Sequence, residues 1–194
     1  FPVALLEAAD AMTMIREHAA EWHVDPDAIA VIGFSAGGHL AANLATSTSD
    51  DVLVAHGYDP DAVRPNGLML AYPVITSGPL AHRGSFDSLL GERRNDSQAL
   101  ESVSIERHID AKTPPVFAWH TVPDETVPYE NTLMLIDACK KAGVSIEAHL
   151  FPQGGHGLSL GTAETAWQGV NGIEPSIQIW PQLAVSWMRR TFAR

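Results

Sequence analysis

A serine lies between small residues where an apolar run gives way to a helix-like segment. Gly33, Ser35 and Gly37 form the pattern G-x-S-x-G within VIGFSAGGHL, residues 31–40. Small neighbours let backbone segments approach a sharp strand-to-helix turn, and that turn lifts the serine hydroxyl to the carboxyl edge of a sheet. The following helix points its N–H groups at the same place, so the Ala36 N–H is a candidate donor to an oxyanion. The pattern predicts a nucleophile; the alternative is a tight turn with an incidental serine.

A serine hydroxyl needs a base to take its proton, and the chain contains nine histidines. His156 lies in PQGGHGLSL, a glycine-rich loop that would let the imidazole reach Ser35. His39 lies one helical turn beyond Ser35 on a helix that leads away from the sheet edge, so we expect it to be structural or to line the substrate site. His120 and His149 lie within strand-like segments, where structural histidines are common. We predict that His156 is the base; a solvent-facing loop histidine is the alternative.

The imidazole in turn needs a carboxylate that holds its tautomer and stabilises its charged form. Asp124 lies in HTVPDETVP, directly after a strand-like segment, and the adjacent Glu125 could compete with it. An acidic turn without a catalytic role is the alternative. The chain order Ser35, Asp124, His156 matches the α/β-hydrolase arrangement and differs from that of trypsin-like and subtilisin-like proteases.

Four short apolar segments alternate with helical ones, which predicts βαβ units and a mostly parallel sheet flanked by helices. The expected strands cover residues 28–33, 67–75, 114–121 and 145–151. The first is apolar throughout, as a strand buried on both faces would be. Each of the three candidate catalytic residues follows one of these strands, so we expect all three at one edge of the sheet.

Helical segments fill the intervals between the strands. The first is indicated by apolar residues at three- and four-residue steps, namely Leu5, Ala8, Met12, Ile15, Ala19 and Trp22. A short helix follows Ser35 and fades near residue 46. Another over residues 130–142 is closed by Gly143, and the last has Pro181 in its first turn.

Residues 77–112 are polar, and we expect a surface excursion there with one short helix. Such a segment would overhang the site and set its specificity. His82, Arg83 and Phe86 are therefore candidate substrate-binding residues, together with His39. An exposed loop is the alternative.

Composition limits the classes of protein that the chain can form. Its 194 residues suit one domain over 1–194, with 45% apolar and 18% charged residues. The net charge of −11 argues against nucleic acid or an anionic membrane as a partner. The single cysteine, Cys139, is expected to be a small buried residue. No segment could span a bilayer and no signal peptide is visible, which favours the cytoplasm, but the sequence begins with Phe1 rather than Met.

Several segments resemble the bacterial α/β-hydrolases labelled xylanase B-like, which are similar to acetyl-esterases and feruloyl-esterase-like proteins. They include DPDAIAVIGFSAGGHLAANLAT, AYPVITSG, HRGSFDSLLG, KTPPVFAWHTVPDETVPYENTLMLIDACKKAG and FPQGGHGLSL. The resemblance covers nearly the whole chain. It implies a serine carboxylic ester hydrolase with Ser35, Asp124 and His156 as its triad, acting through an acyl-enzyme without a metal or cofactor. It also implies a small-molecule ester substrate such as an acetylated sugar or xylo-oligosaccharide. Glycosidase activity would need two facing carboxylates, and the sequence indicates no such pair.

The chain departs from these proteins on its N-terminal side. They carry roughly three or four strands before the first helix seen here, and an HGGG-type loop there supplies a second oxyanion donor. No HGG precedes Ser35 in this chain. The first strand would then be an exposed edge, apolar on both faces. We therefore expect either a fragment of a longer protein or a short form that covers this edge by forming a homodimer.

Two other functions remain compatible with the sequence. Related hydrolases of the formamidase type use the same triad on amides. A truncated, weakly active scaffold that binds a ligand or partner is a further alternative. Reaction of Ser35 with a fluorophosphonate would separate an enzyme from a scaffold.

Overall fold

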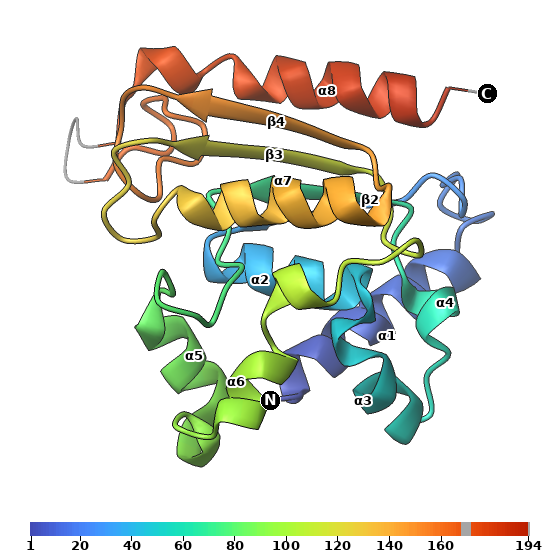
Figure 1. Cartoon of the computed structure of the whole chain (residues 1–194). Coiled ribbons are helices and arrows are strands. Elements are labelled where there is room, and N and C mark those ends of the chain that lie inside the picture. The colour runs from blue at the N-terminus through green and yellow to red at the C-terminus, as the bar shows by residue number, and fades with distance from the viewer. Residues whose placement is uncertain (168–171, 194) are drawn as a thin grey trace.

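A parallel sheet forms the centre of the structure. A computed structural model describes residues 1–167 and 172–193, and within them it shows a four-stranded sheet in the order β1-β2-β3-β4, with every neighbouring pair parallel (Figure 1). The strands are β1 (Ala30–Phe34), β2 (Gly67–Ala71), β3 (Val116–Thr121) and β4 (Ile146–Phe151). The predicted parallel sheet is confirmed, and helical crossovers join its strands, as parallel pairing requires.

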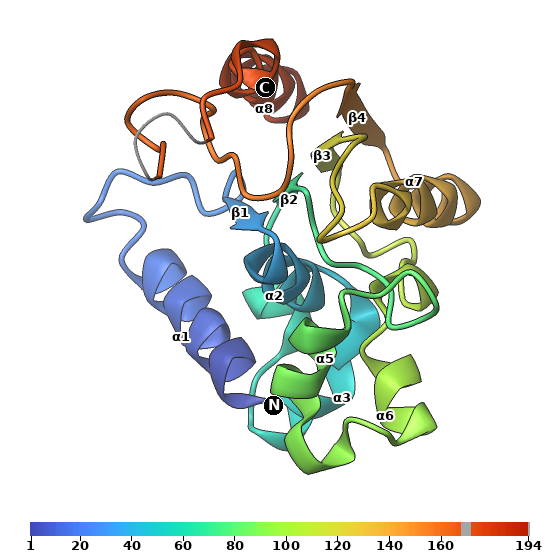
Figure 2. The same ribbon diagram turned by 90° about the vertical axis from the view of Figure 1, so that its left-hand side faces the viewer.

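Different helices cover the two faces of the sheet. The long helices are α1 (Val3–Glu17), α2 (Ala36–Ala45), α7 (Glu130–Ala142) and α8 (Trp180–Thr191). Successive side chains of a strand point to opposite faces, so Leu68 and Leu70 pack towards α2 and α7, whereas Met69 packs towards α8. Figure 1 shows α8 above the sheet with α2 and α7 below it, and Figure 2 shows α1 on the same side as α2.

Short helices occupy segments that the sequence analysis expected to be irregular. They are α3 (Asp50–Ala55), α4 (Pro60–Val63), α5 (Arg83–Leu90) and α6 (Ser97–Ser102), with 3₁₀ turns at Ser47–Ser49, Gly91–Arg93, Ile105–Arg107 and Pro175–Ile177. The prediction of one short helix within residues 77–112 was wrong. Aspartates begin two of these helices: Asp59 accepts a hydrogen bond from the Asp61 N–H, and Asp96 accepts from the N–H groups of Gln98 and Ala99.

The segment 77–112 is also packed more tightly than a surface loop. Phe86 of α5 is only 1% exposed and belongs to an apolar cluster with Val74, Val103 and Val127. This cluster joins α5 to the loops that follow β2 and β3. The segment therefore forms a fixed wall of the fold.

One strand ends earlier than its apolar sequence predicts. β2 ends at Ala71 rather than at Ile75. Tyr72 has a φ of 39°, a conformation that a side chain other than glycine seldom adopts, and Pro73 cannot donate to a ladder. The apolar run continues because these loop residues are buried beneath the site.

The ends of the long helices match the sequence in two places and differ in a third. Gly143, with a φ of 73°, ends α7, and Pro181 lies in the first turn of α8, as predicted. α1 ends at Glu17, earlier than expected. Trp22 is therefore not on its buried face, and its exposed ring stacks on His18 at 5.0 Å.

The strand at the edge of the sheet is open to solvent on one side. Ile32, Met69 and Phe117 occupy one row across β1, β2 and β3, and their exposed fractions are 42%, 9% and 1%. β1 lies at the edge of the described sheet, which confirms the expectation of an apolar edge strand. Its apolar sequence is typical of a strand buried on both faces, but the face that carries Ile32 is open. A groove of about 360 Å³ runs beside it, lined by residues of α1, β1 and α2.

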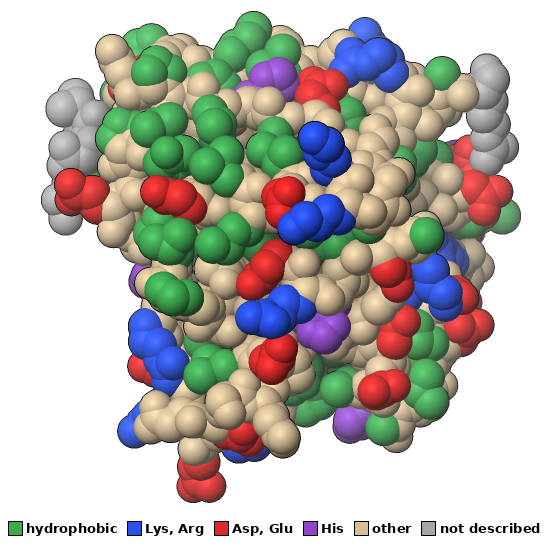
Figure 3. Space-filling view, in the orientation of Figure 1, with side chains coloured by type: hydrophobic (Ala, Val, Ile, Leu, Met, Phe, Trp, Pro, Cys, Tyr) green, Lys and Arg blue, Asp and Glu red, His purple; other side chains and the backbone are tan. Residues whose placement is uncertain are grey.

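The remaining expectations concern the surface and the cysteine. Cys139 is buried as predicted, and burial raises the pKa of its thiol to about 12. Figure 3 shows acidic and basic side chains intermixed on one face of the molecule. Acidic and basic side chains also form ion pairs such as Lys141 with Asp137. In the part of the chain that the structure describes, no helix has the length and apolarity needed to cross a membrane.

Candidate active site

The turn between β1 and α2 holds Ser35 in a strained conformation. Its φ of 53° and ψ of −122° lie outside the regions that side chains normally occupy. The Ser35 N–H donates to the Ala71 carbonyl at 3.0 Å, and the Ser35 carbonyl accepts from the Val74 N–H at 3.1 Å. These bonds fix the serine to the loop after β2, so the strain is maintained by the surrounding backbone.

Close packing at this turn requires some of its glycines but not all. A Cβ at Gly33 would lie 2.3 Å from the Gly37 carbonyl oxygen, and a Cβ at Gly38 would lie 2.9 Å from the Pro73 Cβ. A Cβ at Gly37 would meet nothing within 4 Å. The steric demand that the G-x-S-x-G pattern suggests therefore falls on Gly33 and on Gly38, and Gly37 borders open space.

The loop after β4 brings an imidazole to the serine. His156 Nε2 lies 2.7 Å from Ser35 Oγ, and its ring packs edge to face on Tyr72 with centroids 5.0 Å apart. Gly154 and Gly157 have φ angles of 101° and 77°, which bend the loop back over the sheet edge. The glycines of this loop thus let His156 reach Ser35, as the sequence analysis predicted.

A buried carboxylate completes the arrangement. Asp124 Oδ2 lies 2.7 Å from His156 Nδ1, while Oδ1 accepts from the N–H groups of Thr126 and Val127, each at 2.9 Å. Burial alone raises the pKa of Asp124, but hydrogen bonds from His120, His156 and the Val127 N–H outweigh it and hold that pKa well below its usual range. The carboxylate is therefore ionised at neutral pH, and His156 donates its Nδ1 proton to it.

The structure orders these groups as a chain from hydroxyl to carboxylate. Because His156 Nδ1–H faces Asp124, its Nε2 is left to accept the proton of Ser35. Glu125, the alternative acid, is exposed. Ala36 is the first residue of α2, and N–H groups in the first turn of a helix have no acceptor within that helix.

The candidate substrate-binding residues have structural partners. His39 is buried, with Nε2 2.8 Å from the Val103 carbonyl and Nδ1 3.0 Å from Asn43 Nδ2, and burial lowers its pKa to about 4. Its position four residues after Ser35 directs it under α5. This supports a structural role rather than that of the base.

The other three candidates lie on α5 and its N-terminal side. His82 Nδ1 bonds Ser85 Oγ at 2.8 Å, and the exposed Arg83 pairs with Asp87 at 2.8 Å. Phe86 is a core residue, as described above. The sequence analysis placed them in a loose overhang, whereas their contacts make them part of the wall.

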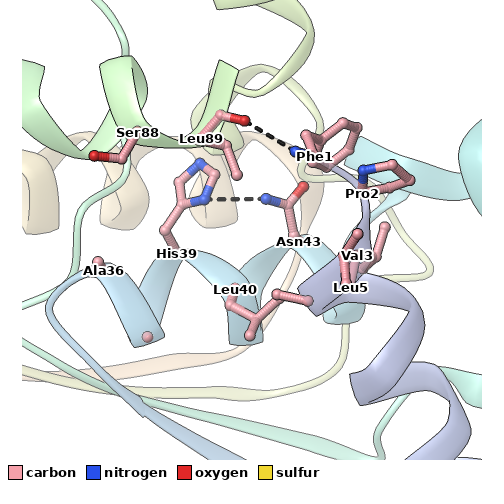
Figure 4. A pocket seen from close by; sticks show the side chains of 12 residues that line it. Phe1, Pro2, Val3, Leu5, Ala36, His39, Leu40, Asn43, Ser88 and Leu89 are labelled. Carbon is pink, nitrogen blue, oxygen red and sulfur yellow. Dashed lines mark hydrogen bonds between the residues drawn. The ribbon is translucent and has the colours of Figure 1, made fainter. Parts of the chain in front are cut away.

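A cavity of about 420 Å³ opens beside the turn (Figure 4). Residues at the N-terminus, on α2 and on α5 line it, including Pro2, His39, Leu40, Ser88 and Leu89. Its walls are mainly apolar, and Ala36 and Gly37 form its border with the turn. The cavity therefore adjoins the N-terminal end of α2, and it does not enclose Ser35, His156 and Asp124.

Three supporting residues were not found from the sequence. His120 contacts Asp124 and Tyr72 contacts His156. Asn131 joins two loops, because its Oδ1 accepts from the Ile75 and Thr76 N–H groups. The only sequence signal is proximity, because His120 lies four residues before Asp124. Within the described residues, no group of three His, Cys, Asp or Glu side chains is arranged to hold a metal ion.

Comparison with known sequences gives a family match and longer relatives. The BD-FAE family model matches residues 1–138. A protein named endo-1,4-beta-xylanase B from Butyrivibrio fibrisolvens is 34% identical over 167 residues, which cover 85% of this chain and 26% of that protein. An acetylxylan esterase from Xylanibacter ruminicola is 30% identical over 153 residues, covering 77% of this chain and 30% of that protein. The chain thus spans less than a third of the length of these two relatives.

Solved structures show the same fold over nearly the whole chain. An acetyl ester-xyloside bifunctional hydrolase from Caldicellulosiruptor lactoaceticus is 37% identical with a TM-score of 0.78, and the match covers 96% of this chain and 65% of that structure. The carboxylesterase Cest-2923 from Lactobacillus plantarum is 28% identical with a TM-score of 0.80, covering 98% and 68%. The α/β-hydrolase fold and the resemblance to xylanase B-like and acetyl-esterase proteins are confirmed.

Proposed function

Because the chain belongs to the BD-FAE family, we propose that it hydrolyses carboxylic esters with Ser35 as nucleophile, His156 as base and Asp124 as acidic partner. The observation that carries this proposal is the unbroken hydrogen-bonded chain Ser35–His156–Asp124, with both links at 2.7 Å. These residues come from three separate strand ends, and only the fold brings them together. Their order and chemistry fit nucleophilic catalysis by an activated serine.

In the proposed reaction Ser35 Oγ attacks the ester carbonyl while His156 Nε2 takes its proton. The new oxyanion accepts a hydrogen bond from the Ala36 N–H, whose position at the start of α2 also gives it the favourable end of the helix dipole. Collapse of this intermediate breaks the bond to the alcohol, which leaves with the proton from His156. Water then attacks the acyl-enzyme by the same route, releasing the acid and restoring Ser35.

Asp124 stays ionised throughout. Its pKa is held low, so it stabilises the imidazolium that His156 becomes in each transition state without taking the proton. The same hydrogen bonds make it unsuited to be the protonated acid that glycoside cleavage needs. We propose ester cleavage for this site, although one relative is named a xylanase and another is described as an acetyl ester-xyloside bifunctional hydrolase.

The proposed substrates are short acyl esters, in particular acetyl groups on carbohydrates. Support comes from two relatives, one named acetylxylan esterase and one described as an acetyl ester-xyloside bifunctional hydrolase. The proposed chemistry needs no metal or organic cofactor. It uses one nucleophile, one base, one ionised carboxylate and the Ala36 N–H.

The test compares an ester with an amide and removes the nucleophile. We expect hydrolysis of an aryl acetate at a higher kcat/KM than that of a formanilide, and a loss in Ser35→Ala on the order of 10⁴-fold or more. A formanilide preferred over the acetate would indicate an amidase instead. Turnover retained in Ser35→Ala, after contaminating esterase is excluded by active-site titration, would contradict the proposed function.

A further inference from the structure

A second histidine lies against the carboxylate of the triad. His120, in β3, has an exposed fraction of 0%, and its Nε2 lies 3.3 Å from Asp124 Oδ2 and 3.0 Å from the Val127 carbonyl oxygen. On the other side of the ring, Nδ1 lies 2.8 Å from Thr132 Oγ1 on α7. The mechanism described above does not use this imidazole.

The partners of the ring determine where its proton lies. An ionised carboxylate and a carbonyl can only accept hydrogen bonds, so the Nε2 that faces both of them must carry hydrogen. Thr132 has a hydroxyl that can either donate to Nδ1 or accept from it, so this contact is satisfied in both cases. The contacts therefore place a hydrogen on His120 Nε2, and this assignment follows from the hydrogen-bond network.

Asp124 Oδ2 thus lies near two imidazole nitrogens, and the His120 Nε2–H that faces it also faces the Val127 carbonyl oxygen at 3.0 Å. His156 Nδ1–H approaches it at 2.7 Å and His120 Nε2 at 3.3 Å, while Oδ1 is held by backbone N–H groups. The shorter contact belongs to the base, and the longer one draws part of the carboxylate charge away from it. Contacts on both oxygens keep the carboxylate from rotating, and they keep its negative charge from concentrating on one oxygen.

We propose that His120 is a positioning residue that fixes the Asp124 carboxylate and sets how strongly it stabilises protonated His156. This inference rests on the proposed function of Ser35, His156 and Asp124. Removing the His120 donor would leave more negative charge facing His156 Nδ1–H. Protonated His156 would then persist to higher pH, so the acidic limb of the activity profile would move upward.

Other groups that could titrate near the base stay in place in such a variant. Tyr72 packs on the His156 ring from the end of β2, Ser35 lies on its Nε2 side, and Glu174 lies against Gly154 of the His156 loop. Each of these contacts is independent of His120. A shift seen only when the His120 donor is lost therefore reports on Asp124.

The test uses three variants of the full chain. His120→Phe removes the donor and keeps a flat ring, His120→Gln keeps an N–H that can reach Asp124, and Thr132→Val removes the other partner of the ring without touching Asp124. We expect His120→Phe to move the acidic limb of kcat/KM for an aryl acetate upward by about one pH unit and to lower kcat/KM about tenfold. His120→Gln should restore both values towards those of the parent, and Thr132→Val should leave the pH profile in place.

A purely structural role would lower stability in all three variants and leave the pH profile unmoved, and that result would overturn the inference. Nuclear magnetic resonance of the parent protein gives a second test that needs neither activity nor a folded variant. We expect the imidazole nitrogens of His120 to show hydrogen on Nε2 at neutral pH, and hydrogen on Nδ1 instead would overturn the inference.

Titration of His156 by the same method separates failure of the inference from failure of the proposed function. A shift of the His156 titration to higher pH in His120→Phe would support the role of His120 even if ester hydrolysis were absent. An unchanged titration in an active enzyme would contradict the inference alone.

Discussion

The two sides of the candidate site differ in how many hydrogen bonds hold their residues and in how exposed these residues are. On the side of β3 and β4, both oxygens of Asp124 are hydrogen-bonded, and the His156 loop is held by bonds from Trp180 Nε1 to the Ser159 carbonyl and from the Ser159 N–H to the Tyr72 hydroxyl. On the side of β1, Ala36 is exposed, Ile32 is 42% exposed, and an apolar cavity borders the turn.

This difference separates two parts of the proposed chemistry. Proton transfer depends on half-buried Ser35 and His156 and on buried Asp124, which are hydrogen-bonded to one another. Stabilisation of the oxyanion depends on the end of α2 that faces the open side. Substitutions on the β3–β4 side should therefore cost more than matched substitutions on the β1 side.

The largest effect is expected from the acid and base themselves. His156→Ala should lower kcat for an aryl acetate by about 10⁴-fold or more, because no other group takes the Ser35 proton, and Asp124→Asn should cost somewhat less. Glu125→Gln is the matched control, since Glu125 is exposed beside Asp124. A loss in Glu125→Gln that exceeds the loss in Asp124→Asn would assign the acid to Glu125.

The second effect compares two residues in one row of the sheet. Phe117→Ala, at a site 1% exposed, should lower the free energy of unfolding by about 3–5 kcal/mol, because it empties a packed volume between β3 and α8. Ile32→Ala, at the open edge, should cost about 1 kcal/mol. Urea denaturation would measure both losses in the free energy of unfolding, provided that the slope m of this free energy against urea concentration is the same in each variant. Equal losses would show that the β1 edge is covered in solution.

A third effect concerns buried His39 on α2 and the dependence of folding stability on pH. Burial lowers the pKa of His39 to about 4, so the unfolded chain binds more protons than the folded one between about pH 4 and 6.5. Stability should therefore fall as pH decreases through this window, by up to about 3 kcal/mol from this residue. His39→Gln should flatten the dependence, whereas His56→Gln at an exposed site should not. A parent protein with flat stability over this range would contradict the burial of a neutral His39.

The smallest effect separates the two glycines of the G-x-S-x-G pattern. Gly33→Ala would place a Cβ 2.3 Å from the Gly37 carbonyl oxygen, and we expect a loss of about 1–3 kcal/mol in stability together with displaced Ser35. Gly37→Ala enters open space near the start of α2 and should be neutral or stabilising by up to about 1 kcal/mol. Thermal denaturation would measure stability, and fluorophosphonate labelling would measure the reactivity of Ser35. Equal damage from both substitutions would mean that the open side is filled in solution.

The sequence predicted where Ser35, Asp124 and His156 lie, but not the residues that support them. Ser35, Asp124 and His156 could be placed because each follows an apolar strand at a parallel sheet edge, where strand order converts chain position into spatial proximity. The contact of His120 with Asp124 could not be predicted, since a histidine in a buried strand gives no sign of which loop folds over it.

Other features were missed because they depend on packing that a pattern does not record. The short helices α3, α4 and α6 are too brief to show a clear hydrophobic period. Capping aspartates begin α4 and α6, and α3 has two aspartates in its first turn. Phe86 stands in a polar stretch but is buried by Val74 and Val127, which come from distant loops. The open space beside Gly37 was likewise not predictable, because it depends on which segments pack next to α2.

Active-site titration with a fluorophosphonate tests the central claim most directly, because it requires an activated serine but not a particular ester. Mass spectrometry of the labelled chain should find stoichiometric modification at Ser35, absent in Ser35→Ala and strongly slowed in His156→Ala. A folded protein that remains unlabelled, or that is labelled at another serine, would contradict the assignment of Ser35, His156 and Asp124 as a working triad.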